Sequence, residues 1–204
     1  MIRNQPTASA PLPLWVRCAG IAWLAVWIPS YARYWGWANF LHVCDVVVLL
    51  TCLGLLLNSR LLLSSQALAS MLPDFFWSLD AGWRWVTGKH LVGGTEYMWD
   101  ATVPLWVRLL SLFHVLWPLI LLAALRRTRY DRRGFALQCG VFAVLLVISR
   151  FLGPADNLNN AFLDPVWHRS FGPAPLHLAV IFLGHAVLFY VPTHSFLAKV
   201  FPSR

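Results

Sequence analysis

The chain alternates long apolar stretches with short polar ones, a pattern that is typical of helical membrane proteins. A bilayer core requires about 20 mainly apolar residues per helix, and the 204-residue chain contains six such stretches. They cover approximately residues 14–33, 38–57, 61–79, 103–125, 135–152 and 175–197. The pattern therefore predicts an all-α, polytopic membrane protein, built as a compact bundle of about six transmembrane helices.

Domain organisation follows from the same pattern. Residues 14–204 contain no internal repeat, low-complexity segment or second domain, and they predict a single transmembrane helical domain. Pro6, Pro11 and Pro13 precede the first stretch. Because proline removes a backbone donor and fixes φ, we expect residues 1–13 to form an irregular, flexible tail.

Composition excludes two other classes of protein. Hydrophobic residues make up 59% of the chain and charged residues only 12%, whereas soluble domains carry about 25% charged residues. A soluble enzyme and a disordered chain are therefore both excluded. All four cysteines (Cys18, Cys44, Cys52 and Cys139) fall within apolar stretches, which argues against a disulfide framework and against paired-cysteine zinc chemistry.

The formal net charge of +8 indicates orientation rather than nucleic-acid binding. Five of the sixteen basic residues lie at positions 126–133, between two predicted spans, and such loops are typically cytoplasmic. This assignment also places Arg3, Arg60, Lys199 and Arg204 inside, so both termini are predicted to be cytoplasmic. Eight of the twelve tryptophans then lie at or beyond the outer interface and form an aromatic belt on that side: Trp35, Trp37, Trp77, Trp83, Trp85, Trp99, Trp106 and Trp167. The expected location is a cell membrane, most simply the bacterial inner membrane.

Ionisable residues at membrane depth are costly and mark candidate functional sites. In the predicted topology they gather toward the outer leaflet. Catalytic candidates are Cys44, Asp45, Asp74 and His114; substrate-binding candidates are His42, Arg108, Arg150, Asn157, His177 and His185.

A cysteine and a histidine together can form a nucleophile and its general base. The imidazole takes the thiol proton, and the thiolate attacks an acyl carbon. Within a leaflet the substrates would be lipid acyl esters, with membrane lipids as the partners. Asp45 or Asp74 would orient the base, and Arg108 or Arg150 would anchor a headgroup.

Structural roles and other functions are compatible with the same residues. Cys44 can be a small buried hydrophobe, Asp74 can pair with Arg108 or Arg150, and His177 can cap a helix start. No metal or other cofactor is expected, because the histidines and Cys44 do not show a metal-binding spacing. The main alternative is a non-enzymatic binding protein or carrier for a lipid headgroup or small anion; a structural subunit of a larger complex is the third.

Several segments resemble the YwaF-like integral membrane family, which is related to a six-helix phospholipid acyltransferase and to androgen-induced-gene-one-like hydrolases. They occur in the family's order and cover about residue 38 to the end: LHVCDV (41–46), QALASMLPD (66–74), FHVLWPL (113–119), NLNNAFLDP (157–165) and FGPAPLH (171–177). The resemblance implies a six-helix bundle with an intramembrane nucleophile at Cys44 and a histidine at His114. It predicts a lipid acyl hydrolase or acyltransferase.

Overall fold

The computed structural model describes residues 12–155 and 157–202, and the regular elements within these ranges are all helical. Each of the six predicted spans contains one continuous or interrupted helical segment. The main helices are α1 (Leu14–Tyr34), α2 (Val43–Leu57), α3 (Arg60–Thr87), α4 (Leu105–Leu110), α5 (Phe113–Thr128), α6 (Gly134–Leu152), α7 (Ala174–His185) and α8 (Val191–Val200).

Four helices are long and apolar enough to cross a membrane: Leu14–Tyr34, Leu105–Thr128, Gly134–Leu152 and Ala174–Val200. The apolar helix α2 has only 15 residues, and α3 has 28 residues but is more polar. The fold is thus that of a helical membrane protein. Of the predicted tail, only Leu12 and Pro13 lie within the described ranges, and Arg3 and Arg204 lie outside them.

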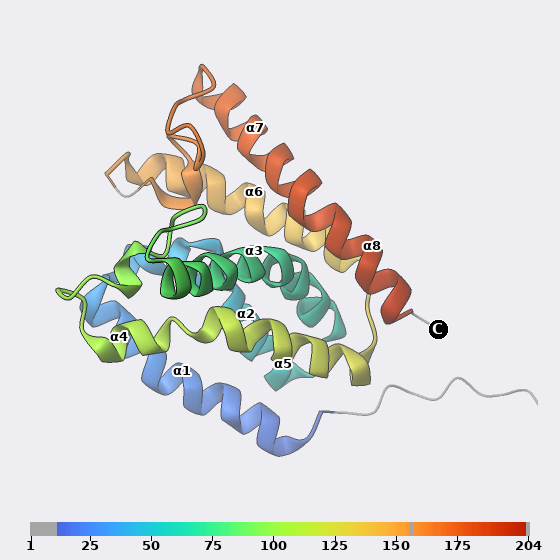
Figure 1. The fold of residues 1–204 in the computed structure, drawn as a ribbon. Helices are drawn as coiled ribbons and strands as arrows, with labels where there is room; N and C mark the ends of the chain where they lie inside the picture. The colour runs from blue at the N-terminus through green and yellow to red at the C-terminus, as the bar shows by residue number, and fades with distance from the viewer. Residues whose placement is uncertain (1–11, 156, 203–204) are drawn as a thin grey trace, which may run out of the picture.

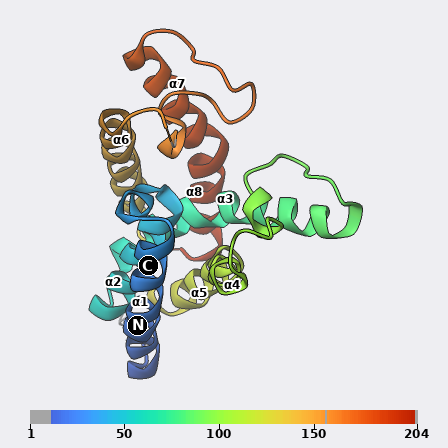
Figure 2. The ribbon, with the colours of Figure 1, turned by 90° about the vertical axis from the view of Figure 1, so that its left-hand side faces the viewer.

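Helix α3 occupies the centre of the bundle, with α1, α2 and α5 on one side and α6, α7 and α8 on the other (Figure 1). It packs against α2, α5, α6 and α8, and every residue from Leu63 to Ser70 is buried. Its carboxyl-terminal part projects beyond the other helices together with the loop that follows it (Figure 2). A helix enclosed by protein can contain polar residues that a lipid-facing helix cannot, which explains the low hydropathy of α3.

The polar side chains of α3 bind neighbouring segments. Ser65 Oγ donates to Gln138 Oε1 of α6 at 3.1 Å, and Gln138 Nε2 donates to the Tyr190 hydroxyl at 3.3 Å. Ser64 Oγ accepts the backbone N–H of Asp131 at 2.8 Å. These buried hydrogen bonds hold α6, the last helical segment and the α5–α6 loop onto α3.

Four segments lie together at one end of the bundle: the start of α1, the α2–α3 turn, the α5–α6 loop and the end of α8. The Leu12 N–H donates to Asn58 Oδ1 at 3.1 Å. Arg60 donates to the Tyr130 carbonyl at 2.6 Å, and the Tyr130 N–H donates to the Phe201 carbonyl at 3.0 Å. We call this the basic end, because Arg60, the arginines of residues 126–133 and Lys199 belong to these segments.

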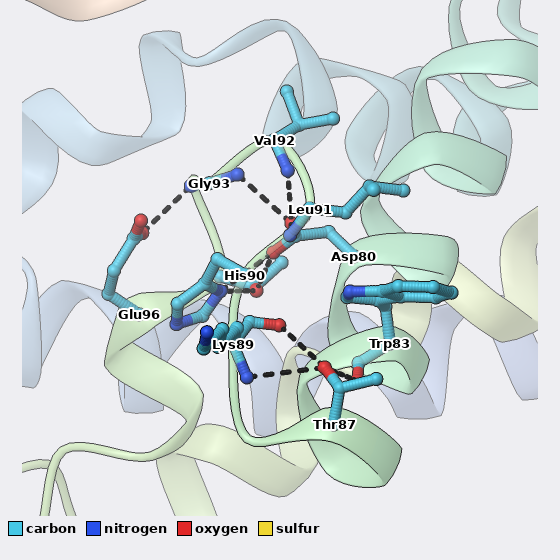
Figure 3. A network of polar contacts seen from close by, with 11 residues as sticks. Asp80, Trp83, Thr87, Lys89, His90, Leu91, Val92, Gly93 and Glu96 are labelled. Atoms are coloured by element: carbon cyan, nitrogen blue, oxygen red, sulfur yellow. Dashed lines mark hydrogen bonds and ion pairs between the residues drawn. The ribbon is translucent and has the colours of Figure 1, made fainter.

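The loop after α3 is folded around the carboxylate of Asp80 (Figure 3). Oδ1 of Asp80 accepts the three consecutive N–H groups of residues 91–93 at 2.7–3.0 Å. Oδ2 accepts the Thr95 hydroxyl and contacts His90 Nδ1 at 2.9 Å. A single buried carboxylate therefore fixes the course of the chain that leads to Gly94 and Tyr97.

Close packing of α6 on α3 makes Gly134 sensitive to substitution. A Cβ at this position would lie 2.8 Å from Ser65 N and 2.9 Å from Ser64 Cβ, whereas a Cβ at Gly140 would meet nothing within 4 Å. We expect Gly134→Ala to reduce the free energy of unfolding by about 1–3 kcal/mol. Unfolding in detergent micelles, with Gly140→Ala as the matched variant on the same helix, measures the difference; equal stabilities would contradict this packing.

The stabilisation that Asp80 gives to the loop after α3 depends on pH. Burial opposes ionisation of this carboxyl, but the hydrogen bonds from Gly93, Thr95 and Val92 outweigh it and hold the pKa of Asp80 well below its usual range. The stabilisation is therefore fully present above the unfolded-state pKa, about 3.9, and is lost as the pH falls toward the folded-state pKa.

Asp80→Asn should lower the unfolding temperature at pH 5–8, with a cost of about 1.5–3 kcal/mol, and the deficit relative to the unsubstituted protein should shrink below about pH 4. Asp100→Asn is the control, because Asp100 is exposed and the hydrogen bonds of its carboxylate join it to its neighbour Thr102 rather than to a long loop. A deficit that does not change with pH would show that the charge of Asp80 is not what stabilises the loop.

Candidate functional site

Cys44 lies in the first turn of α2, and the side chain of Asn159 fixes where that helix begins. Asn159 Oδ1 accepts the N–H of Val43 at 2.9 Å, and its Nδ2 donates to the Leu41 carbonyl at 2.7 Å and to Ser149 Oγ at 2.9 Å. An orphan N–H at a helix start is thereby satisfied by a residue far away in sequence. Asn159 has a φ of 54°, a left-handed conformation that asparagine tolerates better than most residues.

The Cys44 thiol has a carboxylate as its neighbour. Cys44 Sγ lies 3.9 Å from Asp45 Oδ1, and Asn39 Nδ2 donates to Asp45 Oδ2 at 2.5 Å. The Asp45 side chain is buried at the helix N-terminus, where the helix dipole favours negative charge.

His114 lies just after a break between α4 and α5. The ring contacts the Ser111 carbonyl through Nδ1 at 2.9 Å and stacks on Trp77 of α3, with ring centroids 4.4 Å apart and planes inclined by 11°. A carbonyl only accepts hydrogen bonds, so Nδ1 carries the proton, and in the neutral ring Nε2 is the basic nitrogen. Ser111 itself is held by a 2.6 Å hydrogen bond between its hydroxyl and that of Tyr31.

Cys44 and His114 line a common cavity of about 330 Å³, which we call the histidine cavity. The cavity also brings in His42 and Asp45, so four of the predicted site residues meet there. The hydrogen bonds of Cys44 and His114 go to Asp45 and Ser111, respectively, and none joins the thiol to the ring. The other residues that line the histidine cavity are Tyr31, Trp35, Asn39, Trp77, Gly94, Tyr97, Ser111 and Phe113.

Cys44 also lines a second cavity, of about 370 Å³, which we call the asparagine cavity. His42 and Cys44 line both cavities. The asparagine cavity adds three predicted residues, Asp74, Asn157 and His185. Its wall also contains Asn159, the residue that fixes the start of α2.

Asp74 and His185 are held by their own helices. Asp74 Oδ2 accepts the Ser70 hydroxyl at 2.5 Å, and His185 Nδ1 contacts the Ile181 carbonyl at 3.3 Å. His185 is the last residue of α7 and precedes η4 (Ala186–Tyr190), a π-helical turn that continues into α8. Such turns occur frequently at functional sites.

Three predicted substrate-binding residues line neither cavity. Arg108 donates to the Met98 carbonyl at 3.1 Å. Arg150 donates to the Ala161 carbonyl at 3.2 Å and lies 4.0 Å from the Phe162 ring centroid.

His177 contacts the Asn160 carbonyl through Nε2 at 2.9 Å, and its Nδ1 accepts the N–H of Phe171 at 3.3 Å. The buried His177 therefore has both ring nitrogens hydrogen-bonded to the preceding loop. Each of the three side chains that were predicted to bind substrate thus hydrogen-bonds to a carbonyl of the adjoining loop.

Asp45 and Asp74 do not make the contacts that the sequence predicts for them. Neither Asp45 nor Asp74 hydrogen-bonds to His114; the Ser111 carbonyl orients the ring instead. Nor does Asp74 pair with Arg108 or Arg150, since the ion pairs within the described ranges are His90–Asp80 and Arg133–Asp131. In those ranges no group of three or more His, Cys, Asp or Glu side chains is arranged to hold a metal ion.

Sequence reasoning missed Trp77, Tyr31, Ser111 and Asn159. Trp77 was assigned to the aromatic belt, yet it stacks on His114. The one available signal was the group of three asparagines, Asn157, Asn159 and Asn160, a residue type that favours left-handed turns.

Comparison with known proteins finds no matching family model, no matching curated protein and no matching solved structure.

Proposed function

We propose that the chain is a multi-pass protein of the cell membrane, with six spans and both termini in the cytoplasm. Four apolar helices of sufficient length support membrane insertion. Lys and Arg mark the cytoplasmic side, and the basic end carries the arginines of the α5–α6 loop. At the opposite end Trp37, Trp85 and Trp167 are exposed, as expected for an interfacial aromatic belt.

Within this membrane protein, we propose a lipid acyl hydrolase or transacylase that uses Cys44 as nucleophile and His114 as general base. The observation that carries the proposal is that the thiol and the imidazole line one cavity, while the Ser111 carbonyl selects the tautomer in which Nε2 is basic. Catalytic hydrogen bonds are often long in ligand-free enzymes and shorten when substrate binds. Membership of the YwaF-like family is part of the same proposal.

The proposed reaction has two acyl-transfer steps. His114 Nε2 takes the Cys44 proton, and Sγ attacks the carbonyl carbon of a lipid ester. The ester C–O bond breaks to give a thioester on Cys44, and the leaving alkoxide takes the proton from His114. Water or the hydroxyl of a second lipid then attacks the thioester, giving its proton to His114, which returns it to the departing thiolate.

The shared position of Cys44 suits such a reaction. Because the residue lines both the histidine and the asparagine cavities, one cavity can hold the acyl group and the other the acceptor. The alternative function, a carrier or binding protein for a headgroup or small anion, receives less support, because Arg108 and Arg150 donate to loop carbonyls outside both cavities.

Cys44→Ala should abolish acylation of the protein. We expect incubation with a phospholipid carrying a fluorescent acyl chain to add the mass of that chain to the unsubstituted protein, at Cys44, in a form that hydroxylamine releases. Cys18→Ala is the control, because Cys18 is exposed on α1. An undiminished turnover in Cys44→Ala would exclude this cysteine as the nucleophile and would favour a binding function.

His114→Gln tests the base. A glutamine amide can still donate to the Ser111 carbonyl, but it cannot accept the thiol proton, so we expect kcat to fall by roughly 10²–10⁴-fold with little change in KM. Lipid turnover by purified protein in detergent measures this, with His168→Ala in the exposed loop before α7 as control. A variant that retains full kcat would remove the general-base role.

A further inference from the structure

A third cavity, of about 440 Å³, lies between α1, α2 and α5 near the basic end. We call it the apolar cavity: its walls include Trp23 from α1, Leu55 from α2 and Trp117 from α5. Neither Cys44 nor His114 lines it. Its volume falls within the range of small-molecule sites, about 300–1,000 Å³, so the proposed acyl chemistry leaves a cavity of ligand size unexplained.

Arg127 gives this apolar cavity a single charged group. It lies in the last turn of α5 and is exposed, and it belongs to neither ion pair within the described part of the chain. A guanidinium binds phosphate with two parallel hydrogen bonds. The charge therefore complements a ligand that is apolar along its length and anionic at its end.

Two buried indole N–H groups indicate the same class of ligand. Trp23 and Trp117 pack together, with ring centroids 5.1 Å apart, and both line the cavity. Their Nε1 atoms are buried and have no hydrogen-bond partner, which carries a desolvation cost. An ester carbonyl would satisfy such a donor, whereas a plain hydrocarbon would not.

From these observations we infer that the apolar cavity binds one anionic phospholipid. An acyl chain lies between α1, α2 and α5, its ester group is near the two tryptophans, and the phosphate binds Arg127. The surrounding helices α1 and α5 belong to segments long and apolar enough to cross a membrane. Basic pockets of this kind between membrane helices recognise anionic lipid headgroups. The inference does not depend on the acyl chemistry proposed for Cys44.

Native mass spectrometry of the full chain in detergent micelles tests the site, with phosphatidylglycerol and phosphatidylcholine as probes. We expect tighter binding of phosphatidylglycerol, weakened roughly tenfold by Arg127→Gln. Arg126→Gln is the matched control, because it removes the same charge one residue away from an exposed position outside the cavity; its effect should be much smaller.

Filling the cavity provides a second readout. Ala123 is an exposed lining residue of α5, so Ala123→Phe should reduce phosphatidylglycerol binding without unfolding the protein, while Ala136→Phe on α6 should leave binding unchanged. Equal binding of the two lipids, or equal effects of Arg126→Gln and Arg127→Gln, would overturn the inference. Tighter lipid binding after deletion of residues 2–11 would also overturn it, because the N-terminal segment would then be the native occupant.

Discussion

The fold depends on the enclosure of α3 by protein. A backbone or side-chain polar group in a bilayer must find its partner within the protein, and α3 carries serines and a glutamine through its buried stretch, Leu63–Ser70. Ser64 and Ser65 find their partners at Asp131 and Gln138. These pairs require α6 and the loop before it to lie against α3, so the polarity of one helix determines where its neighbours pack.

The same central helix organises the candidate site. Trp77 and Asp74 of α3 line the histidine and asparagine cavities, respectively. Around them the neighbouring segments are irregular: a 3-10 turn precedes α2, α4 and α5 are separate, and a π turn follows His185. Irregular backbone at membrane depth is tolerated where protein or a cavity surrounds it. The interruptions in regular helix accordingly coincide with the positions where Cys44, His114 and His185 line a cavity.

The helical segments were predictable from the sequence because hydropathy reports directly on transfer into lipid. The predicted span 14–33 agrees closely with α1, and 135–152 with α6. The helix that contains the predicted span 61–79 is longer than that span, since α3 continues to Thr87. The meeting of Cys44 with His114 in one cavity was also expected. The environments of Arg108, Arg150 and His177 were not predictable, because the sequence does not show that a carbonyl of the adjoining loop will fold back onto each side chain.

Cys44 and His114 are held in place by different parts of the chain. His114 is held on two sides, by the Ser111 carbonyl and by the Trp77 ring. Cys44 is held through the start of α2, whose first N–H is bound by Asn159. Asn159 also lines the asparagine cavity. Asn159 therefore connects the two parts of the site: the residue that fixes the start of α2, and with it the position of Cys44, is itself part of the wall of the asparagine cavity.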